Sequence, residues 1–366
     1  MNLTVGFDVT SAVKRRGRGI AAYVRSLLDA FSQHDQDLTA HLYIRDRRWL
    51  RRRFAADLLP QAPRHWMLGP LWSCPRELQV FHGLGVHLPA NSPVPRSFTL
   101  HDLRGLDAVE FTHPRWREIR TRRLQQTVER ADGILCLSEH GRQRLHHHFP
   151  EFPLERTAVV PHGLDHQSFR PASESDQQEV REKYELPAPF LLQVGRLDRH
   201  KNPETAIQAF AASRAVGEGF QLVFLGGAET GYVEQLQAMA QSLGVDSAVH
   251  FLGSVPFDEL PVFYSASHLV LVPSYYEGFG MPVLEAMACG AAGLVSQACC
   301  LPEVAGEAWP ALPAAEPQLW AAEFDALLFD QDRRHSMSQA ALARAAGFRW
   351  QSTAAQTLKF LQELAS

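Results

Sequence analysis

Two carboxylates stand eight residues apart in the segment from Ser274 to Pro302. Glu277 precedes a pair of glycines, and Glu285 lies about one turn into a helix that we expect to begin near Pro282. Carboxylate oxygens accept hydrogen bonds from vicinal sugar hydroxyls, so this spacing allows both groups to hold one ligand. Glycines let the backbone approach that ligand, and amides at a helix N-terminus favour phosphate. The alternative is structural: Glu285 complements the helix dipole and Glu277 is a surface turn residue.

Two cations follow an apolar strand in the second half of the chain. Arg196 and Lys201 are five residues apart in the loop before a helix that begins at Pro203. Both can reach one diphosphate beside that helix N-terminus. The chain has four lysines against 32 arginines, so the overall composition does not account for a lysine here. The competing interpretation of each residue is an exposed loop cation.

Strands and helices alternate through both halves of the chain. Apolar runs typical of buried parallel strands are followed by segments whose apolar residues have helical spacing. The polar, proline-containing stretch 166–189 interrupts this alternation and is the best linker candidate. The pattern predicts an α/β protein with two doubly wound domains facing a cleft, where ligands bind beyond the carboxyl ends of the strands. Strands expected in the first half include 3–10, 41–46, 133–138 and 157–165, and a long helix is expected over 114–131.

Composition and charge restrict the class of protein. The 366 residues are 45% hydrophobic and 21% charged, which excludes a disordered or fibrous chain. The net charge is −4, but residues 1–170 hold 25 basic and 17 acidic residues, so an anionic partner would meet the first half. No uncharged apolar run reaches the ~18 residues of a membrane span, and the N-terminus lacks the order of a signal peptide. We therefore expect a cytoplasmic protein.

The motifs occur in the order found in a known enzyme family. Glu277 and Glu285 form an E-x7-E pattern, and Gly195, Arg196 and Lys201 form G-R-x4-K. The chain resembles the retaining glycosyltransferases of family 4, which have the GT-B fold of two Rossmann-like domains. Further matches are His101-Asp102, Ser138-Glu139, Pro161-His162-Gly163-Leu164-Asp165 and Leu301-Pro302-Glu303-Val304. The loop Gly17-Arg18-Gly19-Ile20 with Tyr23 resembles that of bacterial members that build surface polysaccharides.

The resemblance implies a role for each matching residue. Arg196 and Lys201 would hold the diphosphate, and Glu285 would bind the ribose hydroxyls. Glu277 and His101 would lie at the transferred sugar, and the glycine loop would add backbone amides. The catalytic residues expected on this basis are His101, Arg196, Lys201 and Glu277. The expected donor-binding residues are Gly195, Gly278, Phe279, Gly280, Met281, Pro282 and Glu285.

The resemblance also implies a division into three parts. Residues 1–168 would form an acceptor-binding Rossmann-like domain. Residues 169–345 would form a nucleotide-sugar-binding domain of the same type. Residues 346–366 would form a C-terminal helix that returns to the first domain.

The implied reaction transfers a hexose, with mannose as one candidate, from a nucleotide diphosphate sugar to a glycan or lipid-linked acceptor with retention. Cations at the leaving diphosphate stabilise its growing charge, so neither a metal nor another cofactor is expected. The D-x-D strings at Asp35-Asp37 and Asp330-Asp332 flank predicted helices, which favours solvated surface. The alternatives are a sugar-nucleotide epimerase or hydrolase, a catalytically silent binding subunit, and a dehydrogenase that binds a dinucleotide at the N-terminal glycines.

The first half of the chain carries arginine-rich segments. The loop formed by Gly17, Arg18 and Gly19 fits an acceptor or phosphate contact. The runs 45–54 and 115–123 mix arginine with aromatic residues. Our hypothesis is that they dock the first half on an anionic lipid surface at the inner face of the membrane. Nucleic acid is the competing partner, but no nucleic-acid motif accompanies the runs.

One segment departs from the family pattern. The family usually has a small residue and a proline before the next strand, but the run that begins at Gly290 lacks that proline, and the stretch 297–300 is unusual before Leu301. This loop lies near the donor phosphate in relatives, so the resemblance does not imply a particular donor.

Overall fold

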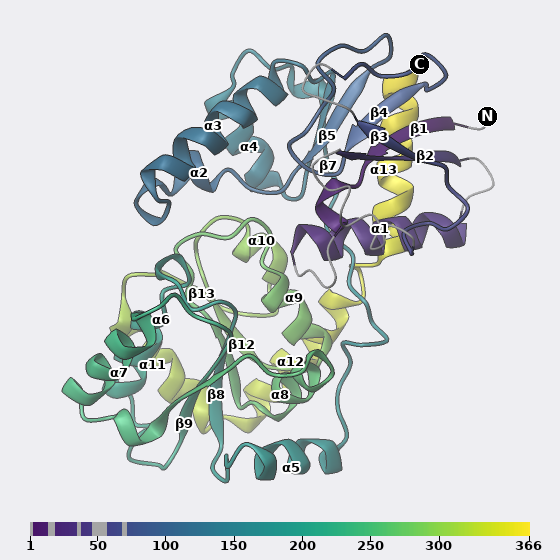
Figure 1. Ribbon diagram of the computed structural model, residues 1–366. Coiled ribbons are helices and arrows are strands. Elements are labelled where there is room, and N and C mark those ends of the chain that lie inside the picture. Colours follow the sequence, from purple (N-terminus) through teal and green to yellow (C-terminus); the bar gives the residue numbers. More distant parts are fainter. Residues whose placement is uncertain (1–2, 14–18, 35–37, 46–56, 68–71) are drawn as a thin grey trace. The chain divides into compact units, whose positions relative to one another are not determined.

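The structure is a computed structural model, and it describes residues 3–13, 19–34, 38–45, 57–67 and 72–366 (Figure 1). It divides into two compact units, Met1–Gly163 with Phe348–Ser366, and Leu164–Gly347. The chain therefore passes from the first unit to the second and back.

The first unit consists of a parallel sheet with helices. Its strands are β1 (Leu3–Asp8), β2 (Leu38–Arg45), β3 (Arg64–Met67), β4 (Val80–Gly83), β5 (Arg96–Leu100), β6 (Gly133–Cys136) and β7 (Thr157–Val159). Its helices are α1 (Ile20–His34), α2 (Arg104–Asp107), α3 (Pro114–Val128), α4 (Glu139–His148) and α13 (Trp350–Ala365).

The second unit repeats this plan. Its strands are β8 (Phe190–Val194), β9 (Gln221–Leu225), β10 (Val249–Gly253), β11 (Leu269–Val272), β12 (Gly293–Ser296) and β13 (Ala311–Leu312). Its helices are α5 (Glu174–Lys183), α6 (Pro203–Ala212), α7 (Tyr232–Ser242), α8 (Leu260–Ala266), α9 (Met281–Ala288), α10 (Leu301–Ala305), α11 (Pro317–Leu328) and α12 (Gln331–Ala345).

Both sheets are parallel and doubly wound. Over the described residues, the strand order is β3-β2-β1-β4-β5-β6-β7 in the first and β10-β9-β8-β11-β12-β13 in the second. Each sheet starts at an inner strand, extends to one side, and then continues on the other. The switch points lie between β1 and β4 and between β8 and β11, and ligands of such folds bind beyond the carboxyl ends of strands at these points.

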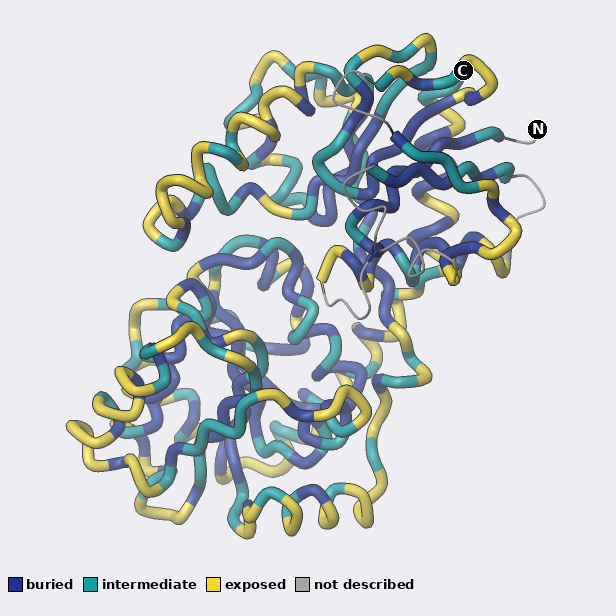
Figure 2. The backbone as a smooth tube through the Cα atoms, viewed as in Figure 1, coloured by how far each residue is buried: buried dark blue, intermediate teal, exposed yellow. Residues whose placement is uncertain are grey.

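The strands are buried because helices cover them, as the dark central segments of Figure 2 show. Leu269 to Val272 of β11 is buried throughout, which is typical of a parallel strand. In the second unit, the fully buried Trp309 donates its ring N–H to the Ala291 carbonyl at 3.2 Å. A buried indole is stable there because both its ring and its N–H have partners.

The C-terminal helix α13 belongs to the first unit and packs against α1. Gly133 lies against residues 360 and 364 of this helix, and a Cβ on Gly133 would lie 2.7 Å from the Phe360 ring. Gly163 packs on the start of α13, where a Cβ would lie 2.3 Å from the Trp350 nitrogen. The units accordingly divide at 163/164 and 347/348 rather than at the expected 168/169 and 345/346.

The stretch 166–189, expected to be a linker, is part of the second unit and contains α5. Ser173 caps this helix by accepting a hydrogen bond from the Asp176 amide, and α5 packs against α8. The expectation was wrong because α5 is polar, with Val180 as its buried apolar residue, so it carries almost no hydrophobic periodicity. The strand expected over 157–165 is also shorter, since β7 ends at Val159.

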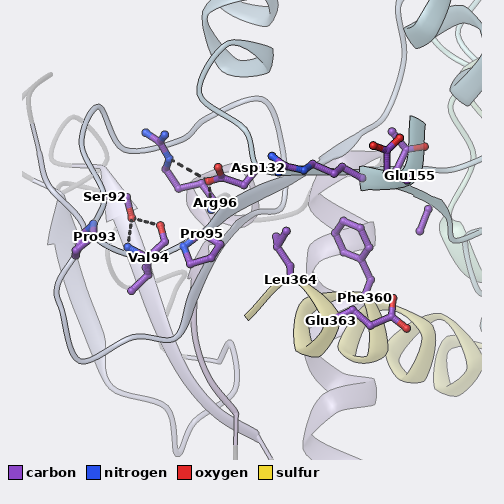
Figure 3. Close-up of a pocket in the computed structure, with 13 residues that line it drawn as sticks. Ser92, Pro93, Val94, Pro95, Arg96, Asp132, Glu155, Phe360, Glu363 and Leu364 are labelled. Carbon is purple, nitrogen blue, oxygen red and sulfur yellow. Dashed lines mark hydrogen bonds and ion pairs between the residues drawn. The ribbon is translucent and has the colours of Figure 1, made fainter. Parts of the chain in front are cut away.

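A cavity of about 590 Å³ opens on the first unit (Figure 3). Its lining includes Arg96 at the start of β5, Asp132 just before β6 and Thr157 at the start of β7. It therefore lies at the amino ends of these strands, opposite the edge where a doubly wound fold binds its ligand.

None of the described helices has both the length and the apolar composition required to cross a bilayer.

Candidate functional site

The loop between β8 and α6 carries the expected cations. Gly195 leaves β8 with φ +138°, a conformation that favours glycine, and its amide donates to the Leu225 carbonyl at 2.9 Å. A short 3-10 turn follows at residues 199–201, and Asn202 then starts α6. This geometry places Lys201 in the turn directly before the helix.

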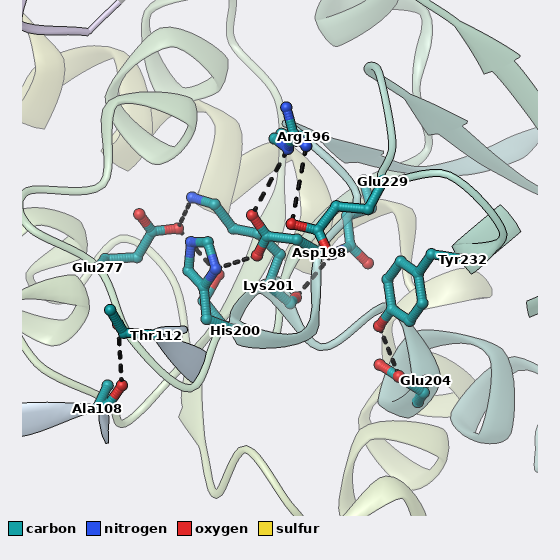
Figure 4. A network of polar contacts seen from close by, with 12 residues as sticks. Ala108, Thr112, Arg196, Asp198, His200, Lys201, Glu204, Glu229, Tyr232 and Glu277 are labelled. Carbon is teal, nitrogen blue, oxygen red and sulfur yellow. Dashed lines mark hydrogen bonds and ion pairs between the residues drawn. The ribbon is translucent and has the colours of Figure 1, made fainter. Parts of the chain in front are cut away.

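Lys201 forms an ion pair with Glu277 (Figure 4). Lys201 Nζ lies 2.5 Å from Glu277 Oε1, and the two side chains are 17% and 9% exposed. Ser274 Oγ donates to the same oxygen at 2.9 Å. The structure thus brings together two predicted catalytic residues from the loops after adjacent strands β8 and β11.

Arg196 lies in a different environment from Lys201. Its side chain is 61% exposed, and its guanidinium nitrogens lie 3.9 Å from an Asp198 oxygen and 3.8 Å from a Glu229 oxygen. The two cations therefore hold separate carboxylates in this structure, although their loop is shared. Solvent screening makes the Arg196 contacts weak, so this side chain is able to turn toward an anionic ligand.

The glycine loop connects β11 to α9. Gly280 has φ +91° directly before the helix, and a Cβ there would lie 2.8 Å from Leu301 Cδ2. The side chain of Phe279 is buried, so this residue can offer only its backbone to a ligand. Gly278, Met281 and Pro282 are half-buried, and the last two form the first turn of α9.

Glu285 lies in the second turn of α9. Its Oε2 accepts a hydrogen bond from the Tyr264 hydroxyl at 3.0 Å, and the residue is half-buried. The expected acceptor of ribose hydroxyls is thus held in one orientation by a tyrosine of α8.

His101 follows β5 in the first unit. Its Nε2 lies 3.1 Å from the Leu84 carbonyl, and its ring centroid lies 4.9 Å from that of Tyr23. Burial lowers the pKa of His101, and the Leu84 hydrogen bond and Asp102 oppose this shift. The imidazole is therefore neutral near pH 7.

Gly19 is the described member of the expected N-terminal glycine loop. It is exposed, with φ +64°, directly before α1. Gly17 and Arg18 lie outside the described residues, as do Asp35 and Asp37. Asp330 of the second D-x-D string caps α12 by accepting from the Arg333 amide at 2.9 Å.

Comparison with known proteins places the chain in a family. The family model for group 1 glycosyl transferases matches residues 176–344, and the model for glycosyltransferase family 4 matches residues 17–168. The D-inositol 3-phosphate glycosyltransferase of Corynebacterium jeikeium is 33% identical over 284 residues, which are 74% of this chain and 67% of that protein. This chain belongs to the group 1 glycosyltransferases. The expected enzyme class and family are thereby confirmed.

A further relative of this glycosyltransferase is also named as a sugar-transferring enzyme. The O-antigen chain mannosyltransferase B of Escherichia coli is 27% identical over 282 residues, which cover 76% of this chain and 73% of that protein. The chain spans about two thirds of the length of the inositol phosphate glycosyltransferases that it matches.

Solved structures confirm the expected GT-B fold class, with its two Rossmann-like units. Sucrose-phosphate synthase of Thermosynechococcus elongatus aligns with a TM-score of 0.76 at 21% identity, covering 99% of both chains. WaaG, a glycosyltransferase of lipopolysaccharide biosynthesis, aligns with a TM-score of 0.69 at 14% identity, covering 98% of this chain and 99% of that one.

Sequence reasoning missed the residues that hold the glycosyltransferase's expected site in place. Ser274 binds Glu277, and the Ser296 hydroxyl donates to the Ser274 carbonyl at 2.6 Å. The Cys300 thiol lies 3.6 Å from the Glu277 carbonyl, and burial, followed by the nearby Glu277, raises its pKa well above the usual value. The unusual stretch before Leu301 was the available signal for Cys300, but nothing local indicated which residue it contacts.

Proposed function

We propose that this glycosyltransferase moves a hexose from a nucleotide diphosphate sugar to a glycan or lipid-linked acceptor, with retention of configuration and without a metal ion. The Lys201–Glu277 pair is the observation that carries the proposal. It lies in the loops that follow β8 and β11, on either side of the second unit's switch point.

The chemistry requires charge stabilisation at the leaving diphosphate. Cleavage of the sugar–phosphate bond increases negative charge on that group, and fixed cations stabilise it without moving a proton. Lys201 is mostly buried, so its charge is less screened than that of a surface lysine. Arg196, on the same loop, supplies a second and more mobile charge.

The carboxylates would bind the donor's hydroxyl groups. Glu277 has Lys201 and Ser274 as partners, and its other oxygen can accept from a sugar hydroxyl. Glu285, oriented by Tyr264, would accept from the ribose. The glycine loop between the two carboxylates, in which Gly278 is half-buried, would place backbone amides against phosphate.

The relatives' names guide the choice of ligands. The E. coli relative is named as a mannosyltransferase, which supports a mannose donor. HepE of Anabaena, similar in fold at 17% identity, was crystallised with UDP and with UDP-glucose, so uridine nucleotides belong in the same panel.

The first test is a thermal-shift panel of UDP, GDP, ADP, TDP and NAD, run with and without EDTA. A ligand at 100 times its dissociation constant adds about 2.7 kcal/mol of stability, which is readily measured. We expect one nucleoside diphosphate to raise the melting temperature equally in EDTA. A shift that EDTA abolishes would contradict metal independence, and a shift with NAD alone would contradict the donor site.

Product analysis then tests the reaction. Incubation with the matching nucleotide sugar and candidate acceptors should give an acceptor-dependent glycoside with the anomeric configuration of the donor, as measured by NMR. Turnover without an acceptor would identify an epimerase or hydrolase. Binding with no turnover on any acceptor would identify a silent subunit.

We also propose that α3 contacts an anionic lipid surface. Arg115, Arg122 and Arg123 are exposed on this helix, and Trp116 is 59% exposed beside them. Cations attract anionic head groups, and a tryptophan inserts at the interface. Of the other run, 46–54 lies outside the described residues.

Liposome co-sedimentation tests the α3 surface. The unaltered protein should pellet with anionic but not with neutral vesicles, and added salt should release it. The double variant Arg122→Gln with Arg123→Gln should bind more weakly. Arg170→Gln with Arg214→Gln removes two exposed arginines of the second unit and is the matched control. Equal binding by both variants would exclude α3 as the contact.

A further inference from the structure

A chain of buried polar side chains lies in the first unit beside His101. His82 of β4 is fully buried, with Nδ1 2.8 Å from Ser97 Oγ and Nε2 3.0 Å from Thr99 Oγ1. The Tyr23 hydroxyl lies 3.2 Å from the same Thr99 oxygen. Buried polar groups are costly unless they are hydrogen-bonded, and each of these groups has a partner.

The protonation states determine which of these buried side chains donate hydrogen bonds and which accept them. Burial, and secondarily the repulsion between the protonated forms of His82 and His101, lowers the pKa of His82 to about 3, so its ring is neutral near pH 7 and carries one N–H. One of its two hydroxyl neighbours must then donate and the other accept. Burial raises the pKa of Tyr23 to about 12, so its hydroxyl stays protonated. Replacing one member leaves a neighbour without its partner.

The last side chain in this hydrogen-bonded series, Tyr23, packs directly on His101. The Tyr23 and His101 rings are edge to face, with centroids 4.9 Å apart at 85°. Tyr23 also packs on His162, with centroids 4.8 Å apart at 69°. Among the described residues, the titratable groups that contact His101 or interact with it electrostatically include Tyr23, His82, His162 and Asp102.

The Leu84 contact determines the tautomer of His101. A carbonyl only accepts, so His101 Nε2 carries the hydrogen at 3.1 Å from the Leu84 oxygen. Nδ1 of the neutral ring is then a hydrogen-bond acceptor. One ring edge is fixed by the carbonyl, and the ring orientation is fixed by Tyr23.

We propose that Tyr23 is a positioning residue, held by Thr99 and His82, that fixes the His101 ring with Nδ1 free to accept from a sugar hydroxyl. The inference rests on the proposed function for the role of His101, and it adds the residues through which the fold orients that ring. Tyr23 acts through His101, because its own hydroxyl is hydrogen-bonded to Thr99.

The test compares variants that remove one hydroxyl. Tyr23→Phe and Thr99→Val keep the side-chain volume and should each lower kcat roughly 5- to 20-fold, with the KM for donor changed by less than about twofold. Thr99→Ser keeps the hydroxyl and should restore most of the rate. Tyr43→Phe alters another buried tyrosine of the first unit, packed on His65 and Trp72, and is the control.

A readout independent of turnover separates this inference from the proposed function. NMR of the His101 ring nitrogens in the unaltered protein should show the Nε2–H tautomer, titrating below the ordinary histidine range. In Tyr23→Ala the ring should become mobile and titrate closer to that range. Unchanged His101 signals in Tyr23→Ala, or kcat values of Tyr23→Phe and Thr99→Val equal to that of Tyr43→Phe, would overturn the inference whether or not transfer is found.

Discussion

The Lys201–Glu277 pair has a structural role in addition to the chemical role that we propose for it. It lies in a mostly buried position, where each charge depends on the other and the Ser274 hydroxyl donates a further hydrogen bond to the carboxylate. Buried charges are tolerated when they are paired, and removing one partner leaves the other uncompensated. We therefore expect loss of the lysine to affect stability as well as catalysis.

We expect Lys201→Ala to lower kcat/KM by roughly 100- to 1,000-fold, because one electrostatic group at a developing charge is worth about 2–4 kcal/mol. Stability should fall by about 1–3 kcal/mol, since Glu277 loses a partner. Steady-state kinetics and urea unfolding measure the two effects. Lys359→Ala is the matched control, because Lys359 is 78% exposed and 3.9 Å from Glu363. Its effect should stay within about 0.5 kcal/mol, and near-normal turnover of Lys201→Ala would remove Lys201 from the mechanism.

Two buried histidines make the stability of the first unit sensitive to acid. Burial, followed by repulsion from the protonated form of His101, lowers the pKa values of His82 and His162 to about 3. An unfolded chain binds these protons near pH 6.5, so between the two values only the unfolded state is protonated. The contribution of these neutral histidines to the free energy of unfolding is therefore fully present above about pH 6.5. It is lost as the pH falls toward 3, by about 1.4 kcal/mol per pH unit for each histidine.

Urea unfolding between pH 7 and 4.5 checks this dependence. His82→Gln keeps a donor and an acceptor between Ser97 and Thr99 but removes one titrating group. Its slope should be smaller than that of the unaltered protein by about 1.4 kcal/mol per pH unit. His166→Gln, at a half-buried histidine in a loop, is the matched control and should change the slope less than His82→Gln does. Equal slopes in both variants would contradict a neutral, buried His82.

At the scale of elements, Asn202 connects the cation-bearing loop to α6. Its φ of 53° is in the left-handed region, and its side-chain oxygen caps the helix at the Thr205 amide. Its Nδ2 donates to the carbonyls of Pro273 and Ala314 at 3.0 and 2.7 Å. The residue thus ties the turn that holds Lys201 to the residue directly after β11 and to the segment that follows β13.

We expect Asn202→Ala to cost about 3–5 kcal/mol, because it combines left-handed strain with the loss of the cap and two buried hydrogen bonds. Asn202→Gly removes the same bonds without the strain and should cost about 1–2 kcal/mol less. Thermal unfolding measures both values. Equal losses would show that the left-handed conformation contributes nothing.

Helix α13 completes the core of the first unit from the far end of the chain. Leu361 is fully buried, whereas the adjacent Gln362 is exposed. We expect Leu361→Ala to destabilise the protein by about 2–5 kcal/mol and Gln362→Ala to have an effect near zero. Urea unfolding compares the two, and a small effect of Leu361→Ala would contradict the packing of α13 on this unit.

At the scale of the whole molecule, the chain builds two sheets with the same winding and gives them different chemistry. The first unit has histidines near the carboxyl ends of its strands, and the second has the Lys201–Glu277 pair at its switch point. Because each unit has its own buried core, a ligand that binds one unit should stabilise that unit.

Hydrogen exchange of the full chain tests this division. A saturating nucleoside diphosphate should slow exchange in 195–202 and 273–285 of the second unit. Exchange around Gly19 in the first unit should not change. Protection confined to the region of Gly19 would contradict the assignment and support a dinucleotide site there.

The alternation of strands and helices could be predicted from the sequence because short-range patterns of apolar residues determine it. A strand buried on both faces needs an unbroken apolar run, and a helix on a sheet needs apolar residues at its own period. The glycine loop, the cations and the family motifs are equally local, so Gly280, Lys201 and Glu277 could be predicted as candidate site residues without a structure. The polar helix α5 lacks such a pattern and was mistaken for a linker.

Only the tertiary structure determines which side chains meet. His82 and Ser97 are paired because β4 and β5 lie in parallel at one register, and Tyr23 reaches Thr99 from a helix 76 residues earlier. The same applies to Cys300 at the Glu277 carbonyl. These contacts depend on strand order and register. Short-range patterns do not specify either, because the same apolar strand sequence is compatible with more than one neighbouring strand.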